Sequence, residues 1–196
     1  FVSAGESSLS FNTSSATLQY SYDGVTWGNV SDYVIKMTKR QPQVLLRGIN
    51  ARGRVEMSGD QISCHGSVMK LTDYRKDVTT VQYCMSFKDC KALIRAPDLP
   101  ATILSERCYE GMFSGCTSLI SAPELPATTL VKGCYNSMFR YCSNLKSVTA
   151  LFEKSVTSSL NGWLTGVSSI STFYKNAEAV WENSGIIPDG WDVVLV

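Results

Sequence analysis

Cysteine is the residue of this sequence with the widest chemical range, because its thiolate can bind a metal, form a disulfide or act as a nucleophile. The chain has seven cysteines among 196 residues. Two of them flank CYEGMFSGC, from Cys108 to Cys116, and the same spacing returns in CYNSMFRYC, from Cys134 to Cys142. An odd count leaves at least one thiol that cannot pair within the chain. Structural zinc sites usually take ligand pairs from C-x2–4-C knuckles, which are absent here, so the spacing favours buried thiols over disulfides or metal ligands.

Catalysis would need partners that the sequence scarcely provides. A nucleophilic thiol needs an adjacent base, and His65 is the only histidine. Its neighbour Cys64 would point to the opposite face of a strand. The acids Asp98 and Glu124 recur at one position of a proline-rich turn and could form the carboxylate pair of a glycoside hydrolase, although a recurring acid at a turn is more typical of solvated surface. The sequence therefore predicts no enzyme, no metal and no cofactor, with a glycan-active enzyme as the least favoured alternative.

Aromatic residues offer a second kind of chemistry, the stacking of rings on sugars. Four tryptophans could line such a platform or could close a core, and the second interpretation is the commoner one: Trp27, Trp163, Trp181 and Trp191. The stretch SYDGVTW, Ser21 to Trp27, approximates the S-x-D-x-G-x-T-W box of sialidases but is one residue short. That box is a hairpin element and not a catalytic site, so we interpret this copy as a structural hairpin.

Charge and hydropathy narrow the class of partner. The formal charge is +1 and hydrophobic residues make up 44% of the chain, so a substantial core is expected and no basic footprint for nucleic acid is present. No apolar run reaches the ~20 residues of a membrane-spanning helix. The first fifteen residues, FVSAGESSLSFNTSS, lack the basic start and apolar stretch of a signal peptide and are typical of a trimmed mature start.

The elements that must position these side chains belong to an internal repeat. Residues 82–107 and 108–133 align without gaps over a period of 26 residues. The shared positions include Tyr83/Tyr109, Phe87/Phe113, Cys90/Cys116, Leu93/Leu119 and Leu104/Leu130. A third copy begins at Cys134, and a degraded fourth copy, NGWLTGVSSI, has Trp163-Leu164 at the Met-Phe place, Val167 at the cysteine place and Ile170 at the leucine place. Periods of ~20–29 residues are typical of leucine-rich repeats.

Each copy predicts one coil of a solenoid. Leu119 to Ala122 is a strand candidate, Pro123 to Pro126 turns the chain, and Thr128 or Thr129 can cap a short helix that runs to Phe139. Equivalent positions of stacked coils align along the solenoid axis. We therefore expect a ladder of buried thiols in two sets, Cys90, Cys116 and Cys142, and Cys108 and Cys134.

The regions on either side of the repeats have a different residue pattern. Residues 1–57 contain alternating apolar and polar residues and the hairpin signal Asp23-Gly24, which predict a small β-sandwich. Residues 58–175 form the expected solenoid with its N-terminal cap, and residues 176–196 the C-terminal cap, with a turn at Pro188-Asp189-Gly190 and a terminal strand from Asp192. The expected fold class is α+β, a β-sandwich followed by a short right-handed leucine-rich repeat solenoid.

The pattern CYxxMFxxCxxLxxAPxLPATxL resembles the BspA-like branch of bacterial leucine-rich repeats, found in surface proteins of gut and oral anaerobes. The resemblance extends over roughly residues 58–196 and includes the ending NGWLTGVSSISTFYKNAEAVW and IPDGW. YSYDGVTW is similar to the small β-domain that often precedes such repeats. The resemblance implies an exported, surface-located protein without catalysis, with roles centred on adhesion and binding, and it carries over no defined functional residue.

The residues between the buried strand positions are the candidates for a binding face. We expect them to point outward from one sheet: Ile94, Arg95, Ile120, Ser121, Lys146 and Ser147. The predicted function is a monomeric surface module that binds a host extracellular protein or glycan, and not nucleic acid. The alternative is a structural spacer with no ligand of its own. If the chain is a binding module, Arg95→Glu or Lys146→Glu should weaken the binding of its partner; if it is a spacer, neither change should have such an effect.

Overall fold

The computed structural model is built almost entirely of strands and turns. It describes residues 1–13, 17–30, 34–49, 51, 53–74, 79–81, 84–154, 157–182 and 185–196. Tyr83, one of the expected repeat positions, lies outside the described residues. Within these ranges the only helical segments are two short 3-10 turns, Val68–Leu71 and Thr157–Ser159, and neither is long or apolar enough to cross a membrane.

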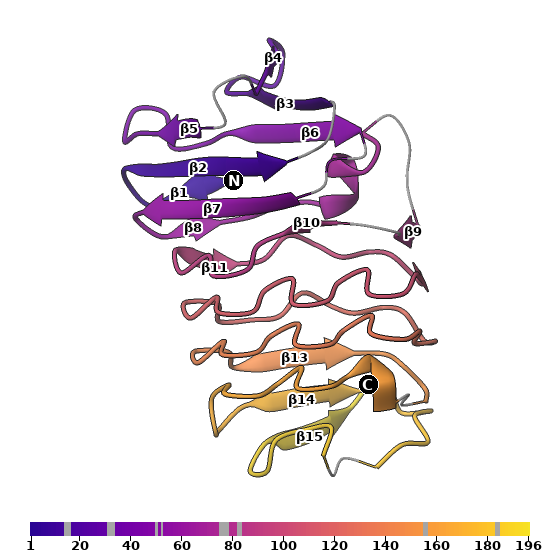
Figure 1. The fold of residues 1–196 in the computed structure, drawn as a ribbon. Helices are drawn as coiled ribbons and strands as arrows, with labels where there is room; N and C mark the ends of the chain where they lie inside the picture. The colour runs from indigo at the N-terminus through magenta and orange to yellow at the C-terminus, as the bar shows by residue number, and fades with distance from the viewer. Residues whose placement is uncertain are drawn as a thin grey trace.

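Two small sheets dominate the N-terminal part (Figure 1). One has the order β10-β7-β2-β5 and the other the order β4-β3-β6. Their strands are β2 (Ser7–Thr13), β5 (Val34–Met37), β7 (Gly53–Gly59), β10 (Met85–Ser86), β3 (Thr17–Ser21), β4 (Gly28–Asn29) and β6 (Leu45–Ile49). β7 runs across residues 57 and 58 and pairs in parallel with β10, so the N-terminal sheet is hydrogen-bonded directly to the first repeat.

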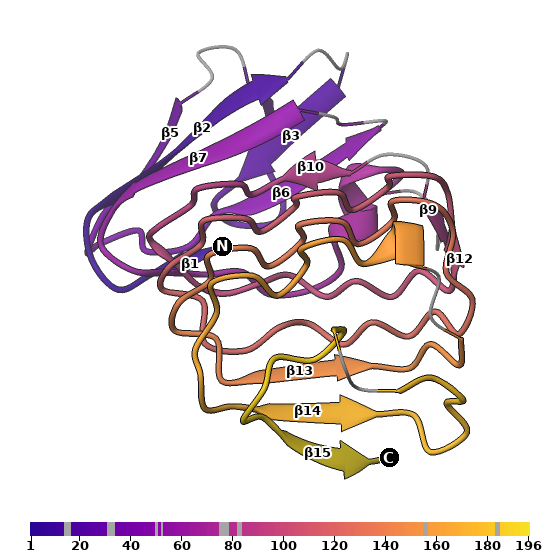
Figure 2. The same ribbon diagram turned by 60° about the horizontal axis from the view of Figure 1, so that its bottom comes forward.

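A row of strands lines one side of the molecule from the N-terminal part to the C-terminal end. It contains β1 (Val2–Ser3), β8 (Ile62–Ser63), β11 (Leu93–Arg95), β13 (Ser147–Ala150), β14 (Thr172–Lys175) and β15 (Asp192–Leu195). Parallel bridges from Arg95 to Ser121 and from Ser121 to Ser147 connect β11 to β13, and β13, β14 and β15 pair in parallel. We call β11, Ser121, β13, β14 and β15 the strand row; Figure 2 shows β13, β14 and β15 side by side. A further pair joins β9 (Thr80–Val81) to β12 (Ile103–Leu104).

The expected α+β leucine-rich repeat solenoid is wrong. The structure is nearly all β, with several small sheets and, over the described residues, no α-helix. The segment expected to be helical, which runs to Phe139, is a succession of turns in both the second and the third repeat. The expected terminal strand from Asp192 is present as β15.

Backbone conformation explains why these segments are not helical. A left-handed residue occurs at every fourth position of these segments: Arg107 (φ 56°), Gly111 (φ 61°) and Gly115 (φ 78°) along residues 107–115, and Gly133 (φ 70°), Ser137 (φ 53°) and Tyr141 (φ 62°) along residues 133–141. A right-handed helix cannot pass through such residues. The spacing of four that resembles a helical face is therefore the spacing of consecutive turns.

Hydrogen bonds show what replaces the helix. Alternate N–H groups donate to the next repeat, as in Tyr109 N to Cys134 O (3.1 Å) and Phe113 N to Met138 O (2.9 Å). The N–H groups between them close local turns, as in Met112 N to Tyr109 O (3.2 Å). Each repeat thus depends on its neighbour for half of its backbone bonds in this segment.

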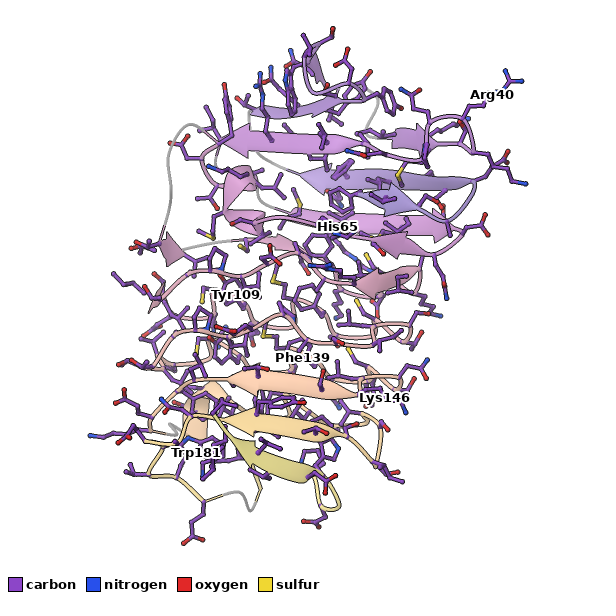
Figure 3. The ribbon with its side chains drawn as sticks, turned by 180° about the vertical axis from the view of Figure 1, so that it is seen from behind. Arg40, His65, Tyr109, Phe139, Lys146 and Trp181 are labelled. Atoms are coloured by element: carbon purple, nitrogen blue, oxygen red, sulfur yellow. The ribbon has the colours of Figure 1, made fainter. Side chains whose placement is uncertain are left out.

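Aromatic stacking fills the core between the two sides. The rings of Phe87, Phe113 and Phe139 stack with centroid separations of 5.6 and 5.7 Å, and Tyr109 stacks on Tyr135 at 6.2 Å. Figure 3 shows Tyr109, Phe139 and Trp181 pointing into the interior from successive levels of the molecule. Phe87 and Phe113, which the gapless alignment of the first two repeats puts at one repeat position, therefore also lie one above the other in the core.

Candidate functional site

The cysteines are free and sit in the interior. All seven are unpaired thiols, and Cys84 alone is half-buried while the others are buried. In one set each Sγ donates to a backbone carbonyl of the preceding level: Cys90 to Val55 O (3.1 Å), Cys116 to Phe87 O (3.0 Å) and Cys142 to Phe113 O (3.1 Å). These thiols therefore tie neighbouring levels together.

The second set, Cys108 and Cys134, packs beside the stacked tyrosines. The place that Cys134 has in the third repeat is taken in the fourth by Ser159, which is fully buried and donates to Val131 O (2.7 Å). Sequence reasoning missed Ser159 because it lies just before the stretch that we aligned. A serine that follows two cysteines at one repeat position is the signal that could have found it.

Burial makes these thiols poor nucleophiles. It raises the pKa of Cys90, Cys108 and Cys142 to about 12 and raises the pKa of Cys116 further still. Because the thiolate is the reactive form, the set is chemically quiet near neutral pH.

The other enzyme-like residues do not converge. Cys64 is buried and burial raises the pKa of its thiol, whereas His65 is exposed. Asp98 lies 4.0 Å from Arg95 across an exposed ion pair, while Glu124 lines a separate hollow. Within the described ranges no three His, Cys, Asp or Glu side chains gather to hold a metal ion.

Three of the four tryptophans close the core. Trp163, Trp181 and Trp191 are buried, and their indole N–H groups donate to the carbonyls of Ile186 (2.8 Å), Phe152 (3.0 Å) and Ser168 (2.8 Å). Trp27 is half-buried, with the Arg47 guanidinium 3.9 Å from its ring centroid. The same guanidinium is 4.4 Å from the ring centroid of Tyr74. Arg47 therefore contacts both rings and covers one face of Trp27.

One repeat residue departs from its expected position. Ile170, aligned with the buried Leu119 and Leu145, is 76% exposed. Ser171 is buried instead and donates to Leu145 O (2.8 Å). In the fourth repeat the buried position is therefore taken by the Ser171 side chain, and Ile170 lies on the surface.

The six residues expected on a binding face lie side by side along the strand row. Arg95, Ser121 and Ser147 are joined by parallel bridges. Ile120 N donates to Ile94 O (3.4 Å), and Lys146 N donates to Ile120 O (2.7 Å). Arg95, Ile120, Ser121 and Lys146 are exposed, and Ile94 and Ser147 are half-buried. Lys146 projects from the side of the molecule in Figure 3.

A hollow opens further along the same face. Its volume is about 510 Å³, within the ~300–1,000 Å³ range of ligand sites. Strand register explains its lining, because Thr149 pairs with Tyr174 in adjacent strands, and residues two apart share a face. The lining residues are Glu124, Thr128, Thr149, Leu151, Tyr174, Asn176 and Val196. We call this hollow the Tyr174 cavity.

One polar group of the cavity is held in place. The Asn176 Nδ2 donates to Leu151 O (2.9 Å), and its Oδ1 accepts from Glu178 N (2.9 Å). A carboxamide has two N–H groups and two oxygen lone pairs, so one donor and one acceptor remain for a ligand. Sequence reasoning missed this cavity, although extending the expected outward face two residues beyond Ser147 leads to Thr149.

Comparison with known proteins returned no match: no family model, no curated protein and no solved structure matches this chain.

Proposed function

We propose that the chain is a non-enzymatic, exported surface module that binds a host extracellular protein or glycan through the outward face of the strand row. The observation that carries the proposal is the continuity of this face. Three repeats each contribute a pair of neighbouring residues that lies along the strand row, Ile94-Arg95, Ile120-Ser121 and Lys146-Ser147, and the Tyr174 cavity follows on the adjacent strands. We further propose a monomer with no affinity for nucleic acid, in line with a formal charge of +1.

The chemistry of the face suits recognition better than catalysis. Ile120 is 50% exposed, Lys146 N donates to its carbonyl, and Arg95 pairs with the next residue, Ser121, so this apolar side chain has a cationic residue in the repeat on either side. Such mixed surfaces are typical of protein interaction sites. The thiols, which are the strongest nucleophiles of the sequence, are buried with raised pKa values, and this argues against a thiol enzyme.

A structural spacer is the second candidate. The observation that favours it is the run of stacked rings from Phe87 through Phe113 to Phe139, continued by Phe152 against Trp163 and Trp181. A core of this kind gives a stiff body whether or not the surface binds anything. The spacer has no saturable ligand.

A binding screen separates the two candidates. The intact chain, shown to be folded by circular dichroism, is tested against extracellular-matrix proteins and an array of mucin and plant glycans at moderate salt. A saturable signal supports the binding module. No signal above millimolar affinity contradicts it and favours the spacer.

A further inference from the structure

The Tyr174 cavity has the composition of a small-molecule site with one charge. Leu151, Tyr174 and Val196 supply apolar surface, and Thr128 and Thr149 supply hydroxyl groups. Among the lining residues that the structure describes, Glu124 is the only one with a charged side chain. The nearby ammonium of Lys175 is directed away from this face, because its Nζ donates to Trp181 O (2.6 Å) and lies 4.2 Å from the Trp181 ring centroid.

These groups match the two sides of a sugar ring. A pyranose has an apolar face of C–H groups, which packs on aromatic and aliphatic side chains, and a rim of hydroxyls that both donate and accept hydrogen bonds. The Glu124 carboxylate is an acceptor, the Thr hydroxyls can do both, and Asn176 retains one donor and one acceptor. A cationic ligand would be attracted by the Glu124 carboxylate but repelled by the remaining Asn176 N–H.

Charge narrows the class of sugar. A phosphate, a sulfate or a carboxylated sugar would meet the Glu124 carboxylate, and no described residue of the lining supplies a cation to neutralise it. Like charges brought together in a site disfavour the wrong ligand. The cavity therefore suits an uncharged sugar.

We propose that the Tyr174 cavity is the subsite for one neutral pyranose unit of a glycan. This inference rests on the proposed binding function and names the ligand class that the strand-row face accepts. The fixed carboxamide of Asn176 is already ordered before a ligand arrives, which lowers the entropic cost of binding.

The test is calorimetric titration of the intact chain with lactose, cellobiose and mannobiose, with 3′-sialyllactose as the anionic match of lactose. At least one neutral disaccharide should bind, and sialyllactose should bind at least about tenfold more weakly than lactose if lactose is the ligand. Tyr174→Ala should weaken the binding of the neutral sugar by about tenfold or more, whereas Tyr174→Phe should keep most of the affinity. Glu124→Lys, at an exposed position, should also abolish binding.

The outcomes separate this inference from the function on which it rests. If no neutral sugar binds at about 10 mM while a matrix protein still gives a saturable signal, the sugar subsite is wrong and the binding module stands. The sugar subsite is also wrong if sialyllactose binds more tightly than lactose. It is wrong as well if the chain prefers a lysine- or arginine-rich peptide and the Glu124→Lys variant no longer binds that peptide. If neither sugars nor proteins bind, both proposals fail.

Discussion

At the residue scale, the side chains with the most chemical potential are used for packing. The cysteines lie inside the repeats and donate to neighbouring carbonyls, and the tyrosines beside them stack. The sequence identifies these residues because types and spacing recur. It does not show their partners, since carbonyls of the adjacent repeat accept the thiol hydrogens.

The raised thiol pKa values predict slow alkylation. With a pKa of about 12 for Cys90, Cys108 and Cys142, only about one thiol in ten thousand is ionised at pH 8. We expect almost no reaction of native, unreduced protein with Ellman's reagent, and seven reactive thiols after denaturation. Rapid labelling of the native chain, or thiols missing after denaturation, would contradict this account.

Two buried hydroxyls give a second prediction at this scale. Among the described residues, the Tyr109 and Tyr135 hydroxyls are buried without a hydrogen-bond partner. An unsatisfied buried hydroxyl costs roughly 1–3 kcal/mol. Tyr135→Phe should therefore leave the free energy of unfolding unchanged or raise it, whereas Tyr135→Ala should lower it by about 3–5 kcal/mol. Urea unfolding measures both, and a clear loss in Tyr135→Phe would reveal a partner for the hydroxyl.

At the element scale, the repeat period and the buried ring positions could be predicted, but the helix could not. A spacing of four is shared by a helical face and by consecutive turns, and the sequence alone favours the helix where Arg107, Ser137 and Tyr141 stand. Their left-handed φ values are imposed by bonds to the next repeat. The candidate face could be predicted as the residues that lie between the buried positions of each repeat, whereas the Tyr174 cavity depends on the pairing of β13, β14 and β15.

Glycine at the end of β7 is required by close backbone packing. Gly59 has φ 91°, and a Cβ there would lie 2.8 Å from the Ser7 Cα and would clash with the Glu6 carbonyl. Gly66 has a similar φ of 77° and open space around it. Gly66→Ala should cost about 1–2 kcal/mol, and Gly59→Ala at least about 3 kcal/mol because overpacking adds to the backbone strain. Equal losses in thermal or urea unfolding would argue against this packing.

The hairpin between β3 and β4 should be sensitive to acid. The Asp23 carboxylate accepts from Val25 N and Thr26 N (both 2.8 Å) and from Ser21 Oγ (2.9 Å). These bonds lower the pKa of Asp23 to about 2, with the backbone N–H of Thr26 the largest cause. Because the pKa is lower in the folded state, the stabilisation is complete above the ordinary value of 3.8 and is lost as pH falls through about 2. An NMR titration of the Asp23 carboxyl measures this, with Asp23→Asn as the control, and a value near 3.8 would refute the hairpin geometry.

At the scale of the whole molecule, one continuous side combines the strand-row face with the Tyr174 cavity, while stacked rings stiffen the interior. Arg95 and Lys146 belong to the strand row, whereas Arg40 projects from the N-terminal end of the molecule, far from Lys146 (Figure 3). Arg40 is also exposed. It is therefore a matched control for reversing a charge on the face.

The measurement that tests the central claim most directly is equilibrium binding of Arg95→Glu, Lys146→Glu and Arg40→Glu to the strongest saturable ligand of the screen, each variant first shown to unfold at the same temperature as the unmodified chain. Reversing either face charge should weaken binding by about tenfold or more, while Arg40→Glu should bind as the unmodified chain does. If the face variants bind normally, or Arg40→Glu loses as much affinity, the strand row is not the binding face.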